Sequence, residues 1–168
     1  MKVGIMQPYF LPYIGYFQLI SSVDKFIVYD NIEYTKKGWI NRNRMLLNGK
    51  DAMFSLPLKK DSDYLNIVER ELSPEFDRVK LLNQFKGAYS RAPYFRDCLP
   101  LLERVLGFED NNLFRFIFHS LTETCAHLEI ATEIVISSTM EVDDYLRGQK
   151  KIIALCSSAS ASTYINPI

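Results

Sequence analysis

Apolar residues near the start of the chain change from a continuous run to a helical spacing and back. The run over residues 2–6 predicts a strand, and the prolines that follow exclude a regular helix or ladder over residues 7–12. From Tyr13 onward, apolar residues recur three positions apart, which predicts a helix. A β-branched and aromatic run over residues 26–29 predicts a second strand that stops at Asp30. Strand, helix and strand in so short a span predict a βαβ unit with parallel strands.

A hairpin and a helical middle part follow. Residues 40–47 and 52–58 are two extended segments, and the Asn-Gly pair at 48–49 between them is a strong signal for a tight antiparallel turn. Ser73 and Pro74 suit the cap and first turn of a helix. Three helical stretches are expected in the middle of the chain, ending near residues 92, 106 and 128.

Towards the end, the pattern returns to strand, helix and strand. Residues 133–136 predict a strand, residues 137–139 a turn, and residues 143–157 a helix, and Tyr164 begins a last strand. The order of elements therefore predicts an α/β fold with a parallel core sheet, to which a β-hairpin and a helical insertion are added. The length is that of a single domain over residues 1–168.

Composition and charge narrow the class of protein. A hydrophobic fraction of 48% supports a globular core. Twenty basic residues balance twenty acidic ones, so the chain lacks the basic footprint of a dedicated nucleic-acid-binding protein. The apolar runs are too short for a signal peptide or a membrane span. Three cysteines without C-x-x-C spacing indicate reduced thiols and a cytoplasmic protein.

The turn after the first strand is the first candidate site. Ligands of open α/β sheets bind beyond the carboxyl ends of the strands, where this turn lies, and the free N–H groups of the following helix point into the same space. Gly15 would let a phosphate group or a neighbouring backbone approach closely. We expect Gln7, Tyr9 and Tyr16 to orient a substrate. The alternative is a rigid aromatic turn that only packs.

The segment after the second strand, residues 30–44, is the second candidate. Asp30 is a strand-end carboxylate suited to act as a general base, and Lys36 supplies a mobile charge for catalysis or for holding phosphate. Arg42 and Arg44 are two apart in an extended segment, so they point to one side and can grip a phosphate or carboxylate. A solvated, charged hairpin is the alternative. The second candidate site also contains Trp39, which is suited to stacking on a sugar or base, and Asn41 and Asn43, which are suited to binding hydroxyls.

Two other polar patterns are less specific. The hydroxyls of Ser137, Ser138 and Thr139 between a strand and a helix form either an anion cradle or an ordinary helix cap. Three residues of metal-ligating types recur at four-residue steps, at His119, Glu123 and His127. Three ligands along one helix are poor geometry for a closed metal site, so solvated side chains are expected there and no metal.

The N-terminal motifs resemble those of the WbqC-like family of bacterial proteins. The resemblance covers essentially the whole chain, and its most specific part is the Asn-Arg-Asn-Arg block at residues 41–44. The matching motifs are Ile5-Met6-Gln7-Pro8-Tyr9, Leu11-Pro12-Tyr13-Ile14-Gly15-Tyr16-Phe17, Asp24-Lys25-Phe26, Tyr29-Asp30, Lys36-Lys37-Gly38-Trp39-Ile40-Asn41-Arg42-Asn43-Arg44, Leu56-Pro57, Gly148-Gln149, Ile152-Ile153 and Thr163-Tyr164-Ile165-Asn166-Pro167.

This resemblance implies a role in surface-polysaccharide biosynthesis, that of O-antigen and lipopolysaccharide. Members of the family look like accessory enzymes that add glycine or another acyl group to an amino sugar. The implied partners are an anionic or nucleotide-linked small molecule and a sugar acceptor. Members continue past the segment that matches Asn166-Pro167, so the resemblance also implies that this chain lacks the family's C-terminal part.

The order of elements is also similar to the nucleotidyltransferase-type, Rossmann-like α/β fold. Pantothenate-synthetase-like enzymes of that group activate a carboxylate with ATP, so this likeness implies ATP with Mg²⁺ as a cofactor. Its phosphates would lie at Gly15 and at the turn over residues 137–139. The histidines that such enzymes keep around the glycine are replaced here by Tyr13 and Tyr16, which donate hydrogen bonds but carry no positive charge at neutral pH.

Residues and resemblance together predict an acyl or aminoacyl (glycyl) transferase that acts on an amino sugar. The alternative is a non-catalytic ligand-binding or scaffold protein of the polysaccharide assembly machinery. The two predict different surfaces: a deep pocket for the enzyme, and an exposed aromatic patch for the scaffold.

Overall fold

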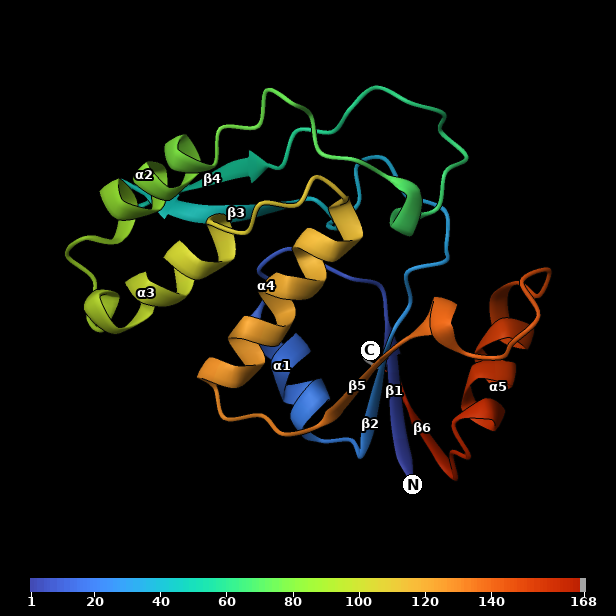
Figure 1. Cartoon of the computed structure of the whole chain (residues 1–168). Helices are drawn as coiled ribbons and strands as arrows, with labels where there is room; N and C mark the ends of the chain where they lie inside the picture. Colours follow the sequence, from blue (N-terminus) through green and yellow to red (C-terminus); the bar gives the residue numbers. More distant parts are fainter. Residues whose placement is uncertain (167–168) are drawn as a thin grey trace.

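The computed structural model describes residues 1–166 and is built on a four-stranded sheet (Figure 1). Its strand order is β5-β2-β1-β6, and all three neighbouring pairs are parallel. The prediction of an α/β fold with a parallel core sheet is confirmed, and the arrangement is consistent with a Rossmann-like core. The strands are β1 (Lys2–Met6), β2 (Lys25–Val28), β5 (Glu133–Ile136) and β6 (Thr163–Ile165).

Helices cover both faces of this sheet. Side chains alternate along β2, so Phe26 belongs to a core shared with α1 (Ile14–Ser21) and α4 (Leu113–His127). Its neighbour Ile27 belongs to a smaller core shared with α5 (Gly148–Ser158). Figure 1 shows α1 and α4 on one side of the sheet and α5 on the other. The result is the three-layer arrangement that buried parallel strands require.

The connections fix where the sheet is expected to bind ligands. The chain moves outward from β1 to β2 and then to β5, and it returns through α5 to β6 on the other side of β1. The direction therefore reverses between β1 and β6, and crevices at such points hold ligands in open α/β sheets. Gln7 follows β1 directly at this edge. Asn166 follows β6, and Pro167 of the same motif lies outside the described residues.

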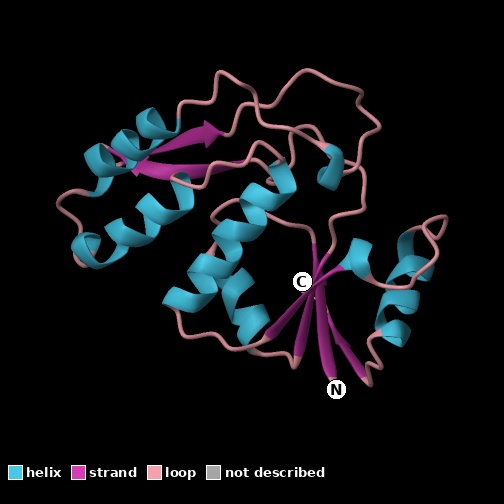
Figure 2. Cartoon of the chain, viewed as in Figure 1, coloured by secondary structure: helices cyan, strands magenta, loops and turns pink. Residues whose placement is uncertain are grey.

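The hairpin and the helical insertion lie between β2 and β5. Strand β3 (Arg42–Leu47) pairs antiparallel with β4 (Lys50–Ser55). Asn48 and Gly49 both have positive φ, +51° and +76°, as the tight turn predicted from their sequence requires. Figure 2 shows α2 (Arg78–Tyr89) and α3 (Phe95–Leu106) beside this hairpin, away from the parallel sheet.

Two predicted helix starts are wrong. Helix α2 begins at Arg78 rather than at Ser73, because Asp77 caps it by accepting a hydrogen bond from Lys80 N at 2.8 Å. Helix α5 begins at Gly148, five residues later than predicted, because residues 143–147 form a loop that accepts bonds from a buried lysine. No helix in residues 1–166 combines the length and the apolar character needed to cross a bilayer.

Candidate functional site

An aromatic pocket joins the first two predicted sites. Its volume is about 300 Å³. The turn after β1 contributes one wall, and the segment leading into β3 contributes the other. We call it the aromatic pocket, and it is lined by Tyr9, Pro12, Tyr13, Trp39, Asn43 and Arg44.

Backbone and amide hydrogen bonds hold the two walls together. Phe10 N donates to the carbonyl oxygen of Ile40 at 3.0 Å. The side-chain amide of Asn43 donates to the carbonyl oxygens of Phe10 and Leu11, at 3.3 and 2.5 Å. Leu11 has a positive φ of +45°, which turns its carbonyl toward this amide. Asn43 therefore positions the pocket, and its amide is already committed rather than available for a hydroxyl.

Trp39 forms the exposed face of the pocket. Its side chain is 46% exposed, and the guanidinium carbons of Arg42 and Arg44 lie 5.6 and 5.5 Å from its ring centroid. These distances are typical of cation–π contacts. The prediction that both arginines point to one side is confirmed. Arg42 Nε also donates to Gly38 O at 2.6 Å, and Arg44 forms an exposed ion pair with Asp51 at 3.3 Å.

Gly15 makes room for a ring of the chain itself. A Cβ atom at this position would lie 2.2 Å from the ring of Tyr13. Tyr13 is 66% exposed and lines the pocket, a role that the sequence analysis did not assign to it. The close approach expected for a phosphate at Gly15 is therefore taken by Tyr13.

The three polar residues of the predicted turn have different environments. Tyr16 is only 1% exposed and donates its phenolic hydrogen to Gln7 O at 2.9 Å, so it supports the turn from the core and does not face a substrate. Burial raises the pKa of Tyr16 well above its usual value near 10. Tyr9 lines the pocket, and burial together with the nearby Tyr13 phenol raises the pKa of Tyr9. Its hydroxyl lies 3.4 Å from Gln7 Oε1.

Asn41 and Lys36 are not part of the aromatic pocket. Asn41 is buried; its amide donates to Leu56 O at 2.8 Å and its carbonyl accepts from the Tyr34 hydroxyl at 2.8 Å. Lys36 pairs with Asp63 at 2.6 Å on the rim of another depression. The structure thus separates Lys36 from Trp39 and Arg44, with which the sequence analysis grouped it.

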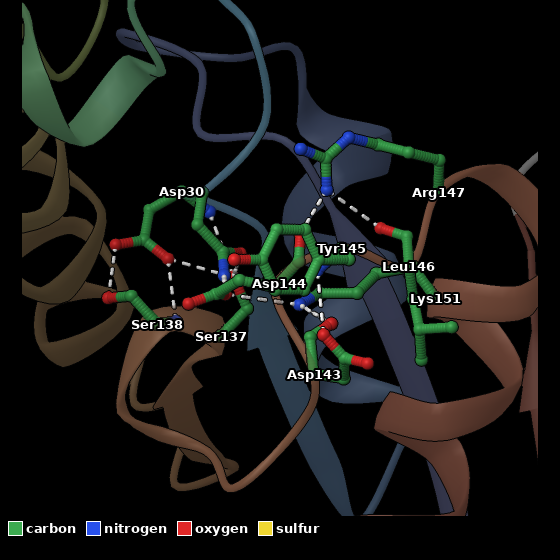
Figure 3. A network of polar contacts seen from close by, with 10 residues as sticks. Asp30, Ser137, Ser138, Asp143, Asp144, Tyr145, Leu146, Arg147 and Lys151 are labelled. Atoms are coloured by element: carbon green, nitrogen blue, oxygen red, sulfur yellow. Dashed lines mark hydrogen bonds and ion pairs between the residues drawn. The ribbon is translucent and has the colours of Figure 1, made fainter.

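Asp30 lies in a hydrogen-bond network at the carboxyl end of the sheet (Figure 3). It is fully buried, and its Oδ1 accepts from the Ser137 hydroxyl at 2.8 Å and from Ser138 N at 2.9 Å. Its Oδ2 accepts from the Ser138 hydroxyl at 2.6 Å. The turn over residues 137–139 is an anion cradle, as one alternative predicted, but the anion is Asp30. Thr139 Oγ1 donates to Ile136 O.

This arrangement corrects two expectations. Asp30 does not face an open cleft: it is fully buried and both of its carboxylate oxygens accept hydrogen bonds within the chain, so it lacks the access that a general base needs. Neither the Ser137–Ser138 turn nor Gly15 offers an open cradle for the phosphates of ATP with Mg²⁺. The residues present at these positions do not fit that cofactor.

The network continues into the loop before α5 (Figure 3). Asn31 Nδ2 donates to Asp144 Oδ1 at 3.1 Å. Lys151 is 1% exposed, and its ammonium donates to Asp143 O at 3.0 Å and lies 3.4 Å from Asp144 Oδ1. No pattern in the sequence indicated Lys151, because its burial depends on a loop over residues 143–147 that was predicted to be helical. We call the groups around Asp30 and Lys151 the closed network.

Comparison with known proteins places these features in a family. Residues 7–168 match the WbqC-like protein family. The chain belongs to the WbqC-like family. It is 30% identical to an uncharacterized protein of Mycobacterium tuberculosis (strain ATCC 25618 / H37Rv), over 98% of this chain and 71% of that protein. No solved structure matches it.

The Asn-Arg-Asn-Arg block of this WbqC-like protein has two separate duties. Asn41 and Asn43 bond to backbone groups and fix the geometry of the hairpin against the turn. Arg42 and Arg44 point the other way and flank Trp39. Alternation along an extended segment explains why one block supplies both structure and surface chemistry.

Two of the three metal-ligating residue types on α4, His119 and Glu123, have partners within the chain. The His119 ring stacks on Phe108 with 4.2 Å between centroids, and Glu123 pairs with Arg104 at 2.6 Å. Within residues 1–166, no cluster of three or more His, Cys, Asp or Glu side chains is arranged to hold a metal ion.

Proposed function

We propose that this WbqC-like protein is a cytoplasmic enzyme of bacterial surface-polysaccharide biosynthesis. It binds an amino sugar in the aromatic pocket and transfers an acyl or aminoacyl group, such as glycyl, from an activated donor such as a thioester to the amine; the amide C–N bond forms, the donor's C–S bond breaks, and the amine proton leaves with the thiol. The observation that carries the proposal is the half-exposed Trp39 ring, which has two arginine guanidiniums within 5.6 Å of its centroid and lines a pocket with Tyr9 and Tyr13. Family membership supports the biological setting.

The chemistry of the pocket suits such a ligand. Flat aromatic rings present broad apolar faces, and tyrosine adds a hydroxyl at the edge, so together they suit a sugar ring that is apolar on one face. Arg42 and Arg44 are suited to a carboxylate or phosphate that the sugar carries, because a guanidinium matches either group with two parallel hydrogen bonds. The preferred ligand is therefore an anionic or nucleotide-linked amino sugar. The proposal contains no adenylation step, because Gly15 and Ser137 face groups of the chain itself.

A fluorescence titration tests this proposal. Trp39 is the single tryptophan of the chain, so its emission reports on this pocket alone. Amino sugars, their 1-phosphates and UDP-linked amino sugars are titrated at low salt, and a saturable change is expected with the anionic forms. Arg42→Ala and Arg44→Ala should each weaken binding by about tenfold, the effect of losing one charge-assisted contact. Arg96→Ala, an exposed arginine on α3, is the matched control.

Unchanged affinity in both arginine variants would contradict the binding role. The transfer step is tested separately by mass spectrometry of the sugar after incubation with glycine and ATP or with a glycyl thioester. A gain of one glycyl residue supports transfer. Pyrophosphate exchange that depends on glycine would show that ATP is used after all.

A scaffold function is the second candidate, favoured by one observation. Tyr13 and Trp39 expose their rings side by side along the same pocket, as a protein-binding patch would. A partner glycosyltransferase that co-purifies with the wild type but not with a Trp39→Ala variant would support it. In that case no sugar should change the emission of Trp39 or raise the melting temperature.

A further inference from the structure

Arg70 is a buried cation without an anion. Its side chain is 4% exposed, and among residues 1–166 it forms no ion pair with any carboxylate. One terminal nitrogen donates to Ser62 O at 2.9 Å, and the guanidinium lies 4.6 Å from the centroid of the Tyr34 ring. Its Nε is buried and has no hydrogen-bond partner among these residues. Buried charges are normally paired, so this one calls for a partner.

Arg70 lines a pocket that has room for such a partner. The volume is about 390 Å³, and the cavity lies between the segment after β2 and the segment after β4. Three lysines stand with Arg70 around it, and two aspartates lie on its rim. We call it the Arg70 pocket, and its ionic lining residues are Lys36, Lys59, Lys60, Asp61, Asp63 and Arg70.

The local field in this pocket favours an anion. Burial raises the pKa of the Tyr34 phenol, but Arg70, Arg42 and Lys36 all act to lower it. Three positive groups therefore act at one point on the pocket wall. The two lysine ion pairs on the rim, Lys36–Asp63 and Lys59–Glu71, are exposed and weak, so the lysines can turn toward a stronger anion.

The backbone holds Arg70 in place independently of any ligand. Arg70 N donates to Ile67 O at 3.2 Å, at the end of the short 3₁₀ helix η1 (Ile67–Glu69). Arg70 O accepts from Leu113 N at 2.9 Å, at the start of α4. A guanidinium on so fixed a backbone is preorganised, which lowers the entropic cost of binding.

We propose that the Arg70 pocket is a second binding site, for a phosphate monoester or a diphosphate. The Arg70 guanidinium places a fixed positive charge in the wall of the pocket, and the lysines add mobile positive charge. The site shares no lining residue with the aromatic pocket. The phosphate-binding proposal can therefore be tested separately from the sugar-binding proposal.

Calorimetric titration with pyrophosphate at low salt tests the site in the full chain. The wild type should bind one equivalent. Arg70→Gln should weaken binding by tenfold or more, and Arg70→Lys should lie between, because it keeps the charge and loses the fork. Arg78→Gln is the matched control: Arg78 also has a partnerless buried Nε and also stacks on aromatic rings, but it lies outside this pocket.

A second set of variants guards against misfolding of the Arg70 variants. Lys36→Gln and Lys60→Gln change exposed side chains of the pocket rim and should each weaken pyrophosphate binding severalfold. Lys37→Gln changes a neighbouring exposed lysine outside the lining and should leave it unchanged. Absence of binding to the wild type, full binding by a folded Arg70→Gln variant, or an equal loss in Lys37→Gln would each overturn the proposal. Arg44→Ala should weaken the response of Trp39 emission to anionic sugars and leave pyrophosphate affinity intact, which separates the two sites.

Discussion

The closed network consists of polar side chains and the aromatic pocket is lined mainly by aromatic rings, and the two also differ in how their polar groups are satisfied. In the closed network, Asp30 accepts three hydrogen bonds and Lys151 is held by the loop before its own helix. In the aromatic pocket, Trp39 and Arg44 are exposed to solvent. The closed network is rich in carboxylate, hydroxyl and ammonium groups, but these groups are bonded mainly to the chain itself and few remain free to bind a ligand.

This difference shows that the type of a polar residue does not tell whether its groups are free to bind a ligand. Asp30 and the serines that bind it have the composition of a catalytic or phosphate site, and they occupy the end of the sheet where such sites form. The hydrogen-bonding groups of Asp30 and these serines are used in bonds to one another. Groups that remain free to bind a ligand lie instead on the hairpin side, at Trp39, and at Arg70, which has no ion pair with any carboxylate in residues 1–166.

Breaking the closed network should give the largest effect on stability. Asp30→Ala removes the acceptor of two hydroxyls and of Ser138 N, so the free energy of unfolding should fall by about 3 kcal/mol or more. Asp30→Asn should lose less, because it keeps one acceptor oxygen. Urea denaturation measures both, with the exposed Asp63→Ala as control. A stable Asp30→Ala protein that had lost all transferase activity would instead assign the carboxylate to the substrate.

Removing the Asn43 hydrogen bonds between the turn after β1 and the hairpin should lower the free energy of unfolding by less than Asp30→Ala does. It should also weaken binding in the aromatic pocket. Asn43→Ala leaves the carbonyls of Phe10 and Leu11 without their donor, and a loss of about 1–2 kcal/mol is expected. Sugar binding, followed by Trp39 emission, should weaken in the same variant. Asn83→Ala, at an exposed position of α2, should change neither quantity. Loss of stability with intact sugar binding would show that the pocket does not depend on this joint.

The buried phenol behind the pocket predicts a loss of stability at alkaline pH. The raised pKa of Tyr16 means that the native state keeps this proton at pH values where the unfolded chain, with a pKa near 10, releases it. Stability from this group is therefore full below pH 10 and falls as the pH rises above it. Burial also raises the pKa of Cys125 to about 11, which adds a loss from about pH 9 upward.

Tyr16→Phe separates these contributions. The variant should lose about 1 kcal/mol at neutral pH, because Gln7 O loses its donor, and it should lose less than the wild type as the pH rises above 10. The midpoints of urea unfolding between pH 8 and pH 11 measure this, with the exposed Tyr145→Phe as control. An unchanged pH profile in Tyr16→Phe would mean that other groups dominate.

Freeing an arginine beside the pocket should give the smallest effect. Asp51→Asn removes an exposed partner of Arg44, and exposed ion pairs contribute little to stability. Urea unfolding should be unchanged, whereas affinity for an anionic sugar should rise about twofold at low salt and show no gain at high salt. Asp97→Asn, on α3, controls for the change in net charge. A measurable drop in stability would mean that the pair belongs to the structural part of the hairpin.

Local patterns in the sequence were sufficient for the strands. Period and turn chemistry indicated the βαβ unit, the hairpin at Asn48 and Gly49, and the strand over residues 133–136, because each depends on neighbours in sequence. The helix over residues 14–21 was also found, but the spacing of its apolar residues does not show which of them are buried. Ile14 is exposed, whereas Tyr16 is buried against Phe26. Tertiary packing decides such choices between adjacent apolar positions.

The sequence predicted several of the residues that lie at the candidate site, but it did not predict which residues distant in the sequence contact one another. Strand alternation placed Arg42 and Arg44 on one side, and position in the sheet indicated the turn after β1. The contact between Asp30 and Ser137 spans 107 positions and follows from β2 and β5 being neighbours, which no local pattern specifies. The fold also determines that Arg70 has no carboxylate partner among residues 1–166. Ion pairing depends on which residues, distant in the sequence, surround the guanidinium, and no local pattern specifies them.

The pairing of β6 with β1 has a consequence for how the protein is made. Ser162 N and Thr163 N donate to Met1 O, and Ser162 lies 161 positions after Met1. At about 5–20 residues per second, a ribosome takes on the order of ten seconds or more to cover that distance. Through this interval one edge of β1 has no strand beside it, and Val3 and Ile5 lack the helix that later covers them. Strand β1 is therefore completed only after β6 has been synthesised, and until then the nascent chain depends on keeping that edge from other chains.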